Sequence, residues 1–283
     1  MLILVTGAAS PLGTAVTAHF MSAGHSVRGL VRTLDHPAAI STEILRGDIT
    51  DPAVVAAAAR DVEVAVHCAA SHASDLADSR RVNVTGTEFL CEALLASSRT
   101  PLLVHISTVS VYDDAAGPDF GEDSALWSHP SDGSYGFTKA EGERAIGDAV
   151  GRGLAAVTLR PSMILSLHAR ARWGAEAVAR ARASDGWVLP FRELPYTHED
   201  NVVAAIVLAT RTPGARGRAY NLVDAVLDTP EYLGAIYAAA GKRPPHIPPD
   251  LPRLRFAAER ARRELQWRPA QKGRAFLSQL CAE

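Results

Sequence analysis

Residues 2–13 read LILVTGAASPLG, a short apolar run followed by a turn that contains two glycines. The apolar run is too short for a secretion signal and has no cationic lead, so we expect a first β-strand here. Leu12, Val16 and Phe20 then recur at helical spacing, which predicts a helix directly after the turn. Such a turn lets the backbone approach a pyrophosphate at the helix N-terminus, where unpaired N–H groups attract an anion.

The two glycines have distinct roles in this interpretation. Gly7 would make the tight turn, and Gly13 would allow the helix to pack closely against the strand. Ser10 stands where a dinucleotide-binding loop often has glycine, and its hydroxyl group could donate to a phosphate. A tight turn with no ligand remains the alternative for this stretch taken alone.

Short apolar runs alternate with segments of helical period along the first 160 residues, which is typical of an α/β fold with a doubly wound parallel sheet. We expect strands at residues 2–5, 27–31, 43–46, 62–66, 101–106 and 154–159. Helices are expected at residues 12–23, from Asp51 onward, at 81–96 and at 135–150. Residues 1–160 are therefore predicted to form a dinucleotide-binding Rossmann domain.

The regular alternation fades after Pro161, so residues 161–283 are predicted to form a smaller substrate-binding lobe. Residues 200–222 are expected to return toward the first domain, which makes the boundary discontinuous. A helix is expected over residues 169–183, where four arginines could grip an anionic substrate or simply form a solvated helix face. These arginines are Arg170, Arg172, Arg180 and Arg182.

The composition excludes several classes of protein. There are 29 Lys plus Arg against 31 Asp plus Glu, so no basic excess indicates binding to nucleic acid. No apolar window approaches the roughly 18 residues that a membrane span needs. Three widely spaced cysteines and no paired Cys/His spacing favour free thiols and no metal site. We therefore expect a cytoplasmic protein.

The end of the second expected strand points to the form of the cofactor. An NAD-selective site usually carries a carboxylate there for the adenosine ribose, but this strand ends in Val31, Arg32 and Thr33. Arg32 could neutralise a 2′-phosphate, which predicts NADP rather than NAD. Arg28 is a lesser candidate because it points to the other face of the strand.

Tyr135 and Lys139 lie four residues apart at the start of an expected helix, and therefore on one face of it. An ammonium group near a phenol favours the phenolate, so this tyrosine could act as an acid or base near neutral pH. Ser107 and Thr108 follow an expected strand, at the sheet edge where α/β active sites gather. A hydroxyl group at that place can bond to a substrate oxygen.

These motifs occur in the order seen in extended short-chain dehydrogenases/reductases, and the chain resembles their NAD-dependent epimerase/dehydratase branch. The motifs are TGAASPLG (6–13), GDITD (47–51), VHCAA (66–70), NVTGT (83–87), STVSVY (107–112), YGFTK (135–139) and RPS (160–162). The likeness continues through YTHEDNV (196–202), YNL (220–222) and ELQWRP (264–269), so it covers nearly the whole chain. Two departures are Ser10, in place of the middle glycine, and LSL at 165–167, where many relatives have Gly-Pro.

The resemblance implies a catalytic triad of Thr108, Tyr135 and Lys139, with the last two also touching the cofactor. It implies that Ser107 lies beside the nicotinamide ribose. The remaining implied cofactor contacts are Gly7, Ser10, Leu12 and Gly13 at the pyrophosphate, Asp48 and Ile49 at the adenine, Ala69 and Ala70 at the ribose and pyrophosphate, and Pro161 and Ser162 at the carboxamide. Arg32 resembles the NADP-preferring members.

Three functions of different classes stay open at this point. The first is an enzyme that moves hydride between NADP(H) and a carbonyl or hydroxyl carbon of a small molecule, with nucleotide-sugar epimerisation or dehydration as the variant. The second is a non-catalytic NADP(H)-binding sensor, and the third is a structural subunit. The family often pairs through a four-helix interface, which implies a homodimer through the helices at 81–96 and 135–150. Of the ten histidines, His67, His72, His105 and His198 are expected to be structural or to support the site.

Overall fold

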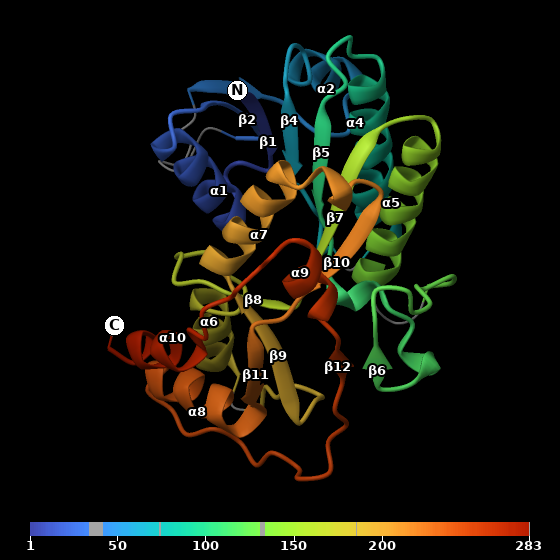
Figure 1. Cartoon of the computed structure of the whole chain (residues 1–283). Coiled ribbons are helices and arrows are strands. Elements are labelled where there is room, and N and C mark those ends of the chain that lie inside the picture. Colours follow the sequence, from blue (N-terminus) through green and yellow to red (C-terminus); the bar gives the residue numbers. More distant parts are fainter. Residues whose placement is uncertain (34–41, 74, 131–133, 185, 283) are drawn as a thin grey trace.

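Seven strands form one parallel sheet, with the order β10-β7-β5-β4-β1-β2-β3 (Figure 1). The computed structural model describes residues 1–33, 42–73, 75–130, 134–184 and 186–282. The strands are β1 (Leu2–Thr6), β2 (Ser26–Val31), β3 (Glu43–Arg46), β4 (Val64–His67), β5 (Leu102–Ile106), β7 (Ala155–Pro161) and β10 (Arg218–Leu222). Chain order reverses at β1, as in a doubly wound sheet, so the predicted fold class is confirmed.

Helices cover both faces of the sheet (Figure 1). One face carries α1 (Pro11–Ser22), α7 (Glu199–Arg211) and α9 (Glu259–Glu264) over one apolar cluster. The other face carries α2 (Pro52–Ala58), α4 (Gly86–Leu95) and α5 (Ser134–Gly151) over a second cluster. The homodimer that the resemblance implies would use α4 and α5, and it stays a prediction.

A smaller lobe lies beyond the carboxyl ends of the strands (Figure 1). Its three-stranded sheet contains β8 (Met163–Leu165), β9 (Glu193–His198) and β11 (Ala225–Asp228). Its helices are α6 (Ala175–Ala183), α8 (Thr229–Ala239) and α10 (Gly273–Leu280). A separate pair, β6 (Asp119–Phe120) and β12 (Arg255–Phe256), joins distant parts of the chain.

Residues 199–222 lie with the large sheet. Helix α7 packs against α1, and β10 pairs in parallel with β7. The division of the chain at residue 160 into two domains stays a prediction.

The helix expected over residues 169–183 is wrong over residues 169–174, because α6 begins at Ala175. Residues before it form turns, with Ala171 N donating to the His168 carbonyl and Gly174 N to the Ala171 carbonyl. Ala171 is buried and anchors this loop. Arg170 and Arg172 therefore lie on a loop and do not share a helix face with Arg180 and Arg182.

The helix expected over residues 81–96 is present, but helical structure begins earlier, at Leu76, and residues 81–85 are π-helical. The chain runs through α3 (Leu76–Arg80), a π-helical segment (Arg81–Thr85) and then α4. The π-helical segment holds a buried polar side chain, Asn83, whose Oδ1 accepts from Ser71 N at 2.8 Å and whose Nδ2 donates to Thr138 Oγ1 at 2.9 Å. The wider turn thus ties the segment after β4 to α5.

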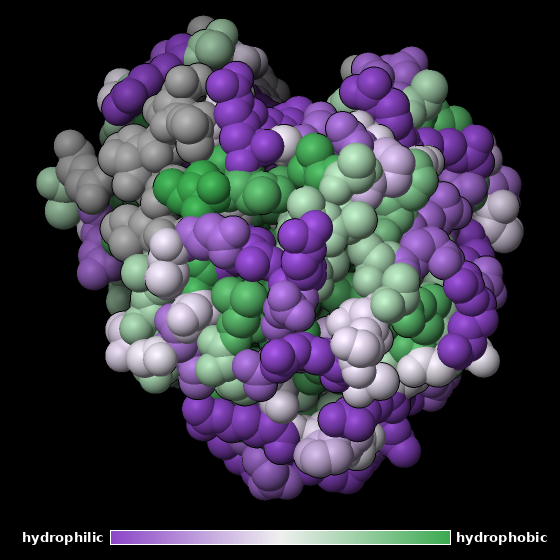
Figure 2. Space-filling model, turned by 90° about the horizontal axis from the view of Figure 1, so that it is seen from above, coloured by the Kyte–Doolittle hydropathy of each residue, from purple (hydrophilic) through white to green (hydrophobic). Residues whose placement is uncertain are grey.

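Figure 2 shows the face at the amino ends of the large sheet, where hydrophilic side chains form most of the outline and apolar ones lie in smaller groups between them. None of the helices in the described ranges combines the length and the apolar character that crossing a membrane requires.

The turn after β1 has the close contacts that its glycines suggested. Gly7 has φ +64°, and Ser10 N donates to its carbonyl oxygen at 2.8 Å. A Cβ on Gly13 would lie 2.2 Å from that same oxygen and 2.9 Å from Ala8 Cα. Helix α1 can therefore approach the turn only because residue 13 has no side chain.

We predict that Gly13→Val displaces the turn and lowers dinucleotide affinity below detection, because the valine side chain would overlap the Gly7 carbonyl. Fluorescence titration with NADPH measures this, and thermal unfolding shows whether the variant is folded. Gly147→Val is the matched control, since a Cβ at that position of α5 meets no atom within 4 Å. A folded Gly13→Val protein with normal affinity would contradict the assignment of the turn.

Candidate active site

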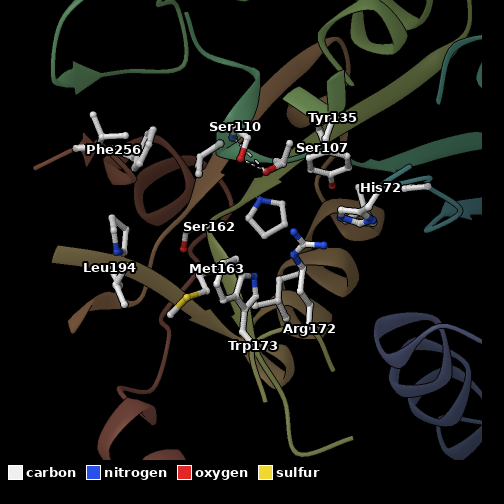
Figure 3. A pocket seen from close by; sticks show the side chains of 18 of the residues that line it. His72, Ser107, Ser110, Tyr135, Ser162, Met163, Arg172, Trp173, Leu194 and Phe256 are labelled. Carbon is white, nitrogen blue, oxygen red and sulfur yellow. Dashed lines mark hydrogen bonds between the residues drawn. The ribbon is translucent and has the colours of Figure 1, made fainter. Parts of the chain in front are cut away.

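A cavity of about 710 Å³ lies between the carboxyl ends of the parallel strands and the smaller lobe (Figure 3). It brings together residues that the sequence assigned to cofactor and catalysis from segments far apart in the chain. Those that line it are Ser10, Leu12, Ala70, Ser107, Thr108, Tyr135, Pro161 and Ser162. The large sheet thus delivers its strand ends, and the loops after them, to one space.

Thr108 begins a single 3₁₀ turn directly after β5. Its Oγ1 accepts from Ser110 N at 3.1 Å and donates to Ser110 Oγ at 3.2 Å. A Cβ on Gly136 would lie 2.2 Å from the Ser110 carbonyl oxygen, so glycine lets α5 approach this turn closely. Thr108 and Tyr135 therefore reach the same cavity from two different elements.

Tyr135 is stacked on His72, with ring centroids 4.0 Å apart and planes 17° from parallel. Figure 3 shows both rings at the cavity, with the guanidinium group of Arg172 pointing toward them. Burial raises the pKa of Tyr135 to about 12 and only the charge of Arg172 opposes the rise, so the expectation that Lys139 brings this pKa toward neutral is wrong. Burial, together with the charges of Arg172 and Lys139, lowers the pKa of His72 to about 4. A protonated phenol thus faces a neutral imidazole at neutral pH.

Lys139 is only 1% exposed and does not form part of the cavity wall. Its Nζ donates to the Ile106 carbonyl oxygen at 2.8 Å and lies 3.2 Å from His105 Nε2. Burial lowers the pKa of Lys139 to about 8, while the nearby Glu143 carboxylate opposes this. Burial also lowers the pKa of His105, so a neutral imidazole accepts from the ammonium group.

A buried ion pair lies beneath the end of β5. Arg160 Nη2 donates to Glu143 Oε2 at 2.6 Å, and both side chains are at most 6% exposed. Ser107 Oγ donates to Glu143 Oε1 at 2.5 Å. Arg160 Nη1 also donates to Tyr112 Oη at 2.8 Å, and Tyr112 Oη donates to Asn221 Oδ1 at 2.6 Å. This network joins α5 to the ends of β5, β7 and β10.

The residues around the first turn fit a dinucleotide phosphate. Ser10 Oγ accepts from Gly13 N at 3.0 Å, which leaves its O–H free to donate to a ligand. On the neighbouring strand end, Ala69 N donates to Thr6 Oγ1 at 3.3 Å and Ala70 lines the cavity. His67 is fully buried and lies 2.7 Å from Thr6 Oγ1, so it shapes this part of the site from below.

Arg32, Asp48 and Ile49 lie outside the cavity wall. Asp48 Oδ1 accepts from Thr50 N and Thr50 Oγ1, both at 2.9 Å. Although burial opposes it, these bonds and the nearby charges of Arg32 and Arg81 lower the pKa of Asp48. Arg32 and Asp48 are thus neighbours at the ends of β2 and β3, whereas the Ile49 side chain is buried in the apolar core.

The outer wall of the cavity is mainly apolar. Phe120 stacks on Tyr112 and Phe256 at centroid distances of 5.2 and 5.3 Å, so the β6–β12 pair forms one side. Met163 and Leu194 come from the smaller sheet. The aromatic residues that line the cavity, besides Tyr135, are Tyr112, Phe120, Trp127, Trp173, Phe191 and Phe256.

The sequence reasoning missed Glu143 and assigned no specific role to His72 or His105. Glu143 had a signal, because it follows Lys139 by four residues as Lys139 follows Tyr135, which places all three on one helix face. His72 had none, since only the fold brings it to Tyr135. His198 caps α7, where its Nδ1 accepts from Asp200 N at 3.3 Å. Within the described ranges, no group of three or more His, Cys, Asp or Glu side chains could hold a metal ion.

Comparison with known proteins agrees with this site. The model of the NAD dependent epimerase/dehydratase family matches residues 3–222. The chain belongs to this family. It is therefore an enzyme of a group that contains nicotinamide-dependent oxidoreductases, epimerases and dehydratases, and the resemblance stated from the sequence is confirmed.

Two relatives are each 31% identical to the chain. One is a 4-hydroxy-2-methyl-3-oxo-4-farnesyl-3,4-dihydroquinoline-1-oxide ketoreductase from Stigmatella aurantiaca, with 79% of this chain and 68% of the relative covered. The other is a 2-alkyl-3-oxoalkanoate reductase from Stenotrophomonas maltophilia, with 85% and 76% covered.

Solved structures share the fold over the full length. A short-chain dehydrogenase/reductase superfamily protein from Agrobacterium tumefaciens with bound NAD has a TM-score of 0.82 at 24% identity, with 100% of this chain and 96% of that chain covered. DesIV, a dTDP-glucose 4,6-dehydratase from Streptomyces venezuelae with NAD and TYD bound, also has a TM-score of 0.82, at 21% identity and with the same coverage.

We predict that Glu143→Gln lowers the free energy of unfolding by about 3–5 kcal/mol, because it leaves the Arg160 charge buried without its partner. Urea unfolding followed by tryptophan fluorescence measures this. Glu92→Gln is the matched control, since Glu92 pairs with Arg152 at the surface and its loss should cost about 0–1 kcal/mol. Equal effects of the two substitutions would show that the buried pair does not hold the site together.

Proposed function

We propose that the protein is an NADP(H)-dependent reductase of a small ketone with apolar substituents, and that Thr108, Tyr135 and Lys139 are its catalytic triad. The observation that carries the proposal is the cavity itself. Thr108 and Tyr135, which both carry hydroxyl groups, line a space whose outer wall is aromatic and aliphatic. A carbonyl group that reaches these hydroxyls must have its substituents against apolar side chains.

The triad residues have separable roles in this proposal. Thr108 Oγ1 orients the carbonyl oxygen, and Tyr135 Oη donates the proton that this oxygen needs. The reduced nicotinamide, when bound, supplies the hydride that adds to the carbonyl carbon. The C=O group thus becomes CH–OH, and the phenol becomes a phenolate that takes a proton back from solvent. Oxidation of an alcohol uses the same groups in reverse.

The charges around Tyr135 suit this chemistry. Its raised pKa of about 12 keeps the phenol protonated, as a general acid must be at neutral pH. Lys139 stabilises the phenolate that follows, provided that its ammonium group is charged. Because its pKa is lowered to about 8, that charge is present below this pH and is lost above it. Bonds to Ile106 and His105 hold the ammonium group in place.

The two ketone-reducing relatives support reduction as the net reaction. The substrates in the names of these two relatives differ, since one is an alkanoate and the other a quinoline oxide, so they leave the polar groups of this chain's substrate open. Nucleotide-sugar epimerisation or dehydration is the alternative, and MoeE5 in complex with UDP-glucuronic acid and NAD shares the fold at 20% identity. The apolar wall of the cavity favours the ketone. A sensor without turnover would have no need of the acid–base groups.

Arg32 supports NADP as the cofactor. It is exposed at the end of β2, and among the described residues it makes no hydrogen bond or ion pair. The positive charge of Arg32 helps to lower the pKa of Asp48, which follows the neighbouring strand β3. Arg28, the lesser candidate, is engaged, because its guanidinium donates to Glu43 and to the Ala58 carbonyl.

We predict that the protein binds NADPH more tightly than NADH, and that Arg32→Ala weakens NADPH binding about ten-fold or more without affecting NADH. A charge-assisted bond to the 2′-phosphate is the reason. Fluorescence titration with both cofactors measures the two affinities. Arg60→Ala removes the same charge from an exposed site after α2 and should change neither. Equal affinity of the wild type for the two cofactors would argue for NAD.

We predict that Tyr135→Phe lowers kcat by about 10²- to 10⁴-fold while NADPH still binds, because only the general acid is lost and the ring can still stack on His72. The rate is measured as the oxidation of NADPH in the presence of methyl 3-oxodecanoate. Lys139→Met should lose both turnover and cofactor affinity. Thr108→Val should lose turnover, whereas Thr108→Ser keeps the hydroxyl group and much of the rate.

Two results would overturn these assignments. A Tyr135→Phe enzyme with wild-type turnover would move the proton transfer to another group. If the wild type reduced none of a panel of aldehydes and ketones but converted UDP-glucose without net consumption of NADPH, the epimerase alternative would replace the reductase.

A further inference from the structure

The loop between β8 and α6 places an arginine beside the candidate general acid. Arg172 is exposed and lies between the buried Ala171 and the half-buried Trp173, in a loop closed by its own backbone hydrogen bonds. Tyr232 Oη donates to the Trp173 carbonyl at 3.1 Å, which fixes the loop to α8. Figure 3 shows the guanidinium group pointing into the cavity, toward Tyr135 and His72.

Among the described residues, Arg172 is the only Lys or Arg that lines the cavity, and it forms no ion pair with any of them. The two acidic residues of the lining are Asp114 and Glu193, and Glu193 is paired with Arg253 at 3.1 Å. The guanidinium group lies over the ring of Trp173, with Arg172 Cζ 5.7 Å from the ring centroid. An unpaired cation in a mainly apolar cavity is poised for an anionic ligand.

The charge of Arg172 acts on the group that would carry out catalysis. It lowers the pKa of Tyr135 against the effect of burial, and it contributes to the lowered pKa of His72. Figure 3 shows the guanidinium group and the phenol at the same part of the cavity, so an anion bound to one lies near a carbonyl bound to the other.

We propose that Arg172 binds a carboxylate of the substrate, so that the substrate class is a 3-oxo acid whose alkyl chain lies along the apolar wall. This rests on the proposed function and names its substrate more closely. In a 3-oxo acid a single carbon separates the ketone from the carboxylate. The fork of a guanidinium group matches a carboxylate with two parallel hydrogen bonds. The Arg172 guanidinium lies over the ring of Trp173, and this tryptophan is the first part of the apolar wall that would hold the alkyl chain of the substrate.

Arg170 has a different position although it is two residues away. Its guanidinium group donates to the Ala9 carbonyl in the first turn, on the phosphate side of the cavity. The structure thus separates the two arginines that the sequence treated together, and Arg172 alone faces the phenol.

The test compares an acid with its ester in the oxidation direction, where both compounds are stable. The substrates are 3-hydroxydecanoate and methyl 3-hydroxydecanoate with NADP⁺, and NADPH formation gives kcat/KM for each. The wild type should prefer the acid about ten-fold or more, and Arg172→Leu should abolish that preference. Arg172→Lys should keep part of it, because the charge remains without the fork.

Two controls isolate the effect on binding. The acid-to-ester ratio of kcat/KM is compared at one pH, because loss of Arg172 raises the pKa of Tyr135 and changes the rate for both substrates alike. Arg180→Leu removes a positive charge from α6, where Arg180 stacks on Trp187 outside the cavity lining, and should keep the preference for the acid.

Each result decides the matter. An acid-to-ester ratio near one in the wild type, or an unchanged ratio in Arg172→Leu, overturns the role of Arg172 while oxidation of the ester still supports the reductase. A loss of NADP⁺ affinity in Arg172→Leu assigns the guanidinium to the cofactor and also overturns it. If the wild type oxidises neither compound, the proposed function itself fails, and the carboxylate site fails with it.

Discussion

The ion pair between Glu143 and Arg160 is the interaction on which the site depends. Glu143 belongs to the helix that carries Tyr135 and Lys139, and Arg160 lies near the end of β7. Ser107, at the end of β5, donates to the same carboxylate. Two buried charges are costly unless their hydrogen bonds are satisfied, and here Ser107, Tyr112 and the Glu122 carbonyl satisfy the remaining ones. The pair therefore sets where α5 lies against the strand ends.

A second buried polar group supports the ammonium of Lys139. His105 stands opposite His67 on the neighbouring strand, and their ring centroids are 5.3 Å apart. Burial keeps both imidazoles neutral, so they add no positive charge beside the lysine. His105 Nδ1 has no hydrogen-bond partner among the described residues, which is a cost to stability. The other nitrogen of this ring, Nε2, is the neutral acceptor beside the Lys139 ammonium group.

The parts that the sequence predicted correctly are those set by local pattern. Apolar runs and helical periods gave the parallel sheet, and the helices expected at residues 12–23 and from Asp51 onward are present as α1 and α2. The four-residue spacing of Tyr135 and Lys139 placed them on one helix face. These signals come from neighbouring residues, so a single sequence contains them.

The parts that the sequence missed depend on contacts between distant segments. The π-helical segment at Arg81–Thr85 is held by Asn83, whose partners Ser71 and Thr138 come from elsewhere in the chain. The first arginines of the 169–183 segment lie in a loop, where turns join Ala171 N to the His168 carbonyl and Gly174 N to the Ala171 carbonyl. His72 reaches Tyr135 only through the folded loop after β4. A local sequence pattern cannot predict which residues from distant segments will be in contact.

The pairing of β12 with β6 has a consequence for how the enzyme is made. The ribosome releases the N-terminal part of the chain first, so the strands that support the first turn can assemble while later residues are still being added. Phe256 completes the ring stack with Tyr112 and Phe120 only after residue 256 has emerged. The strands around the first turn can therefore assemble before the apolar wall of the cavity is complete.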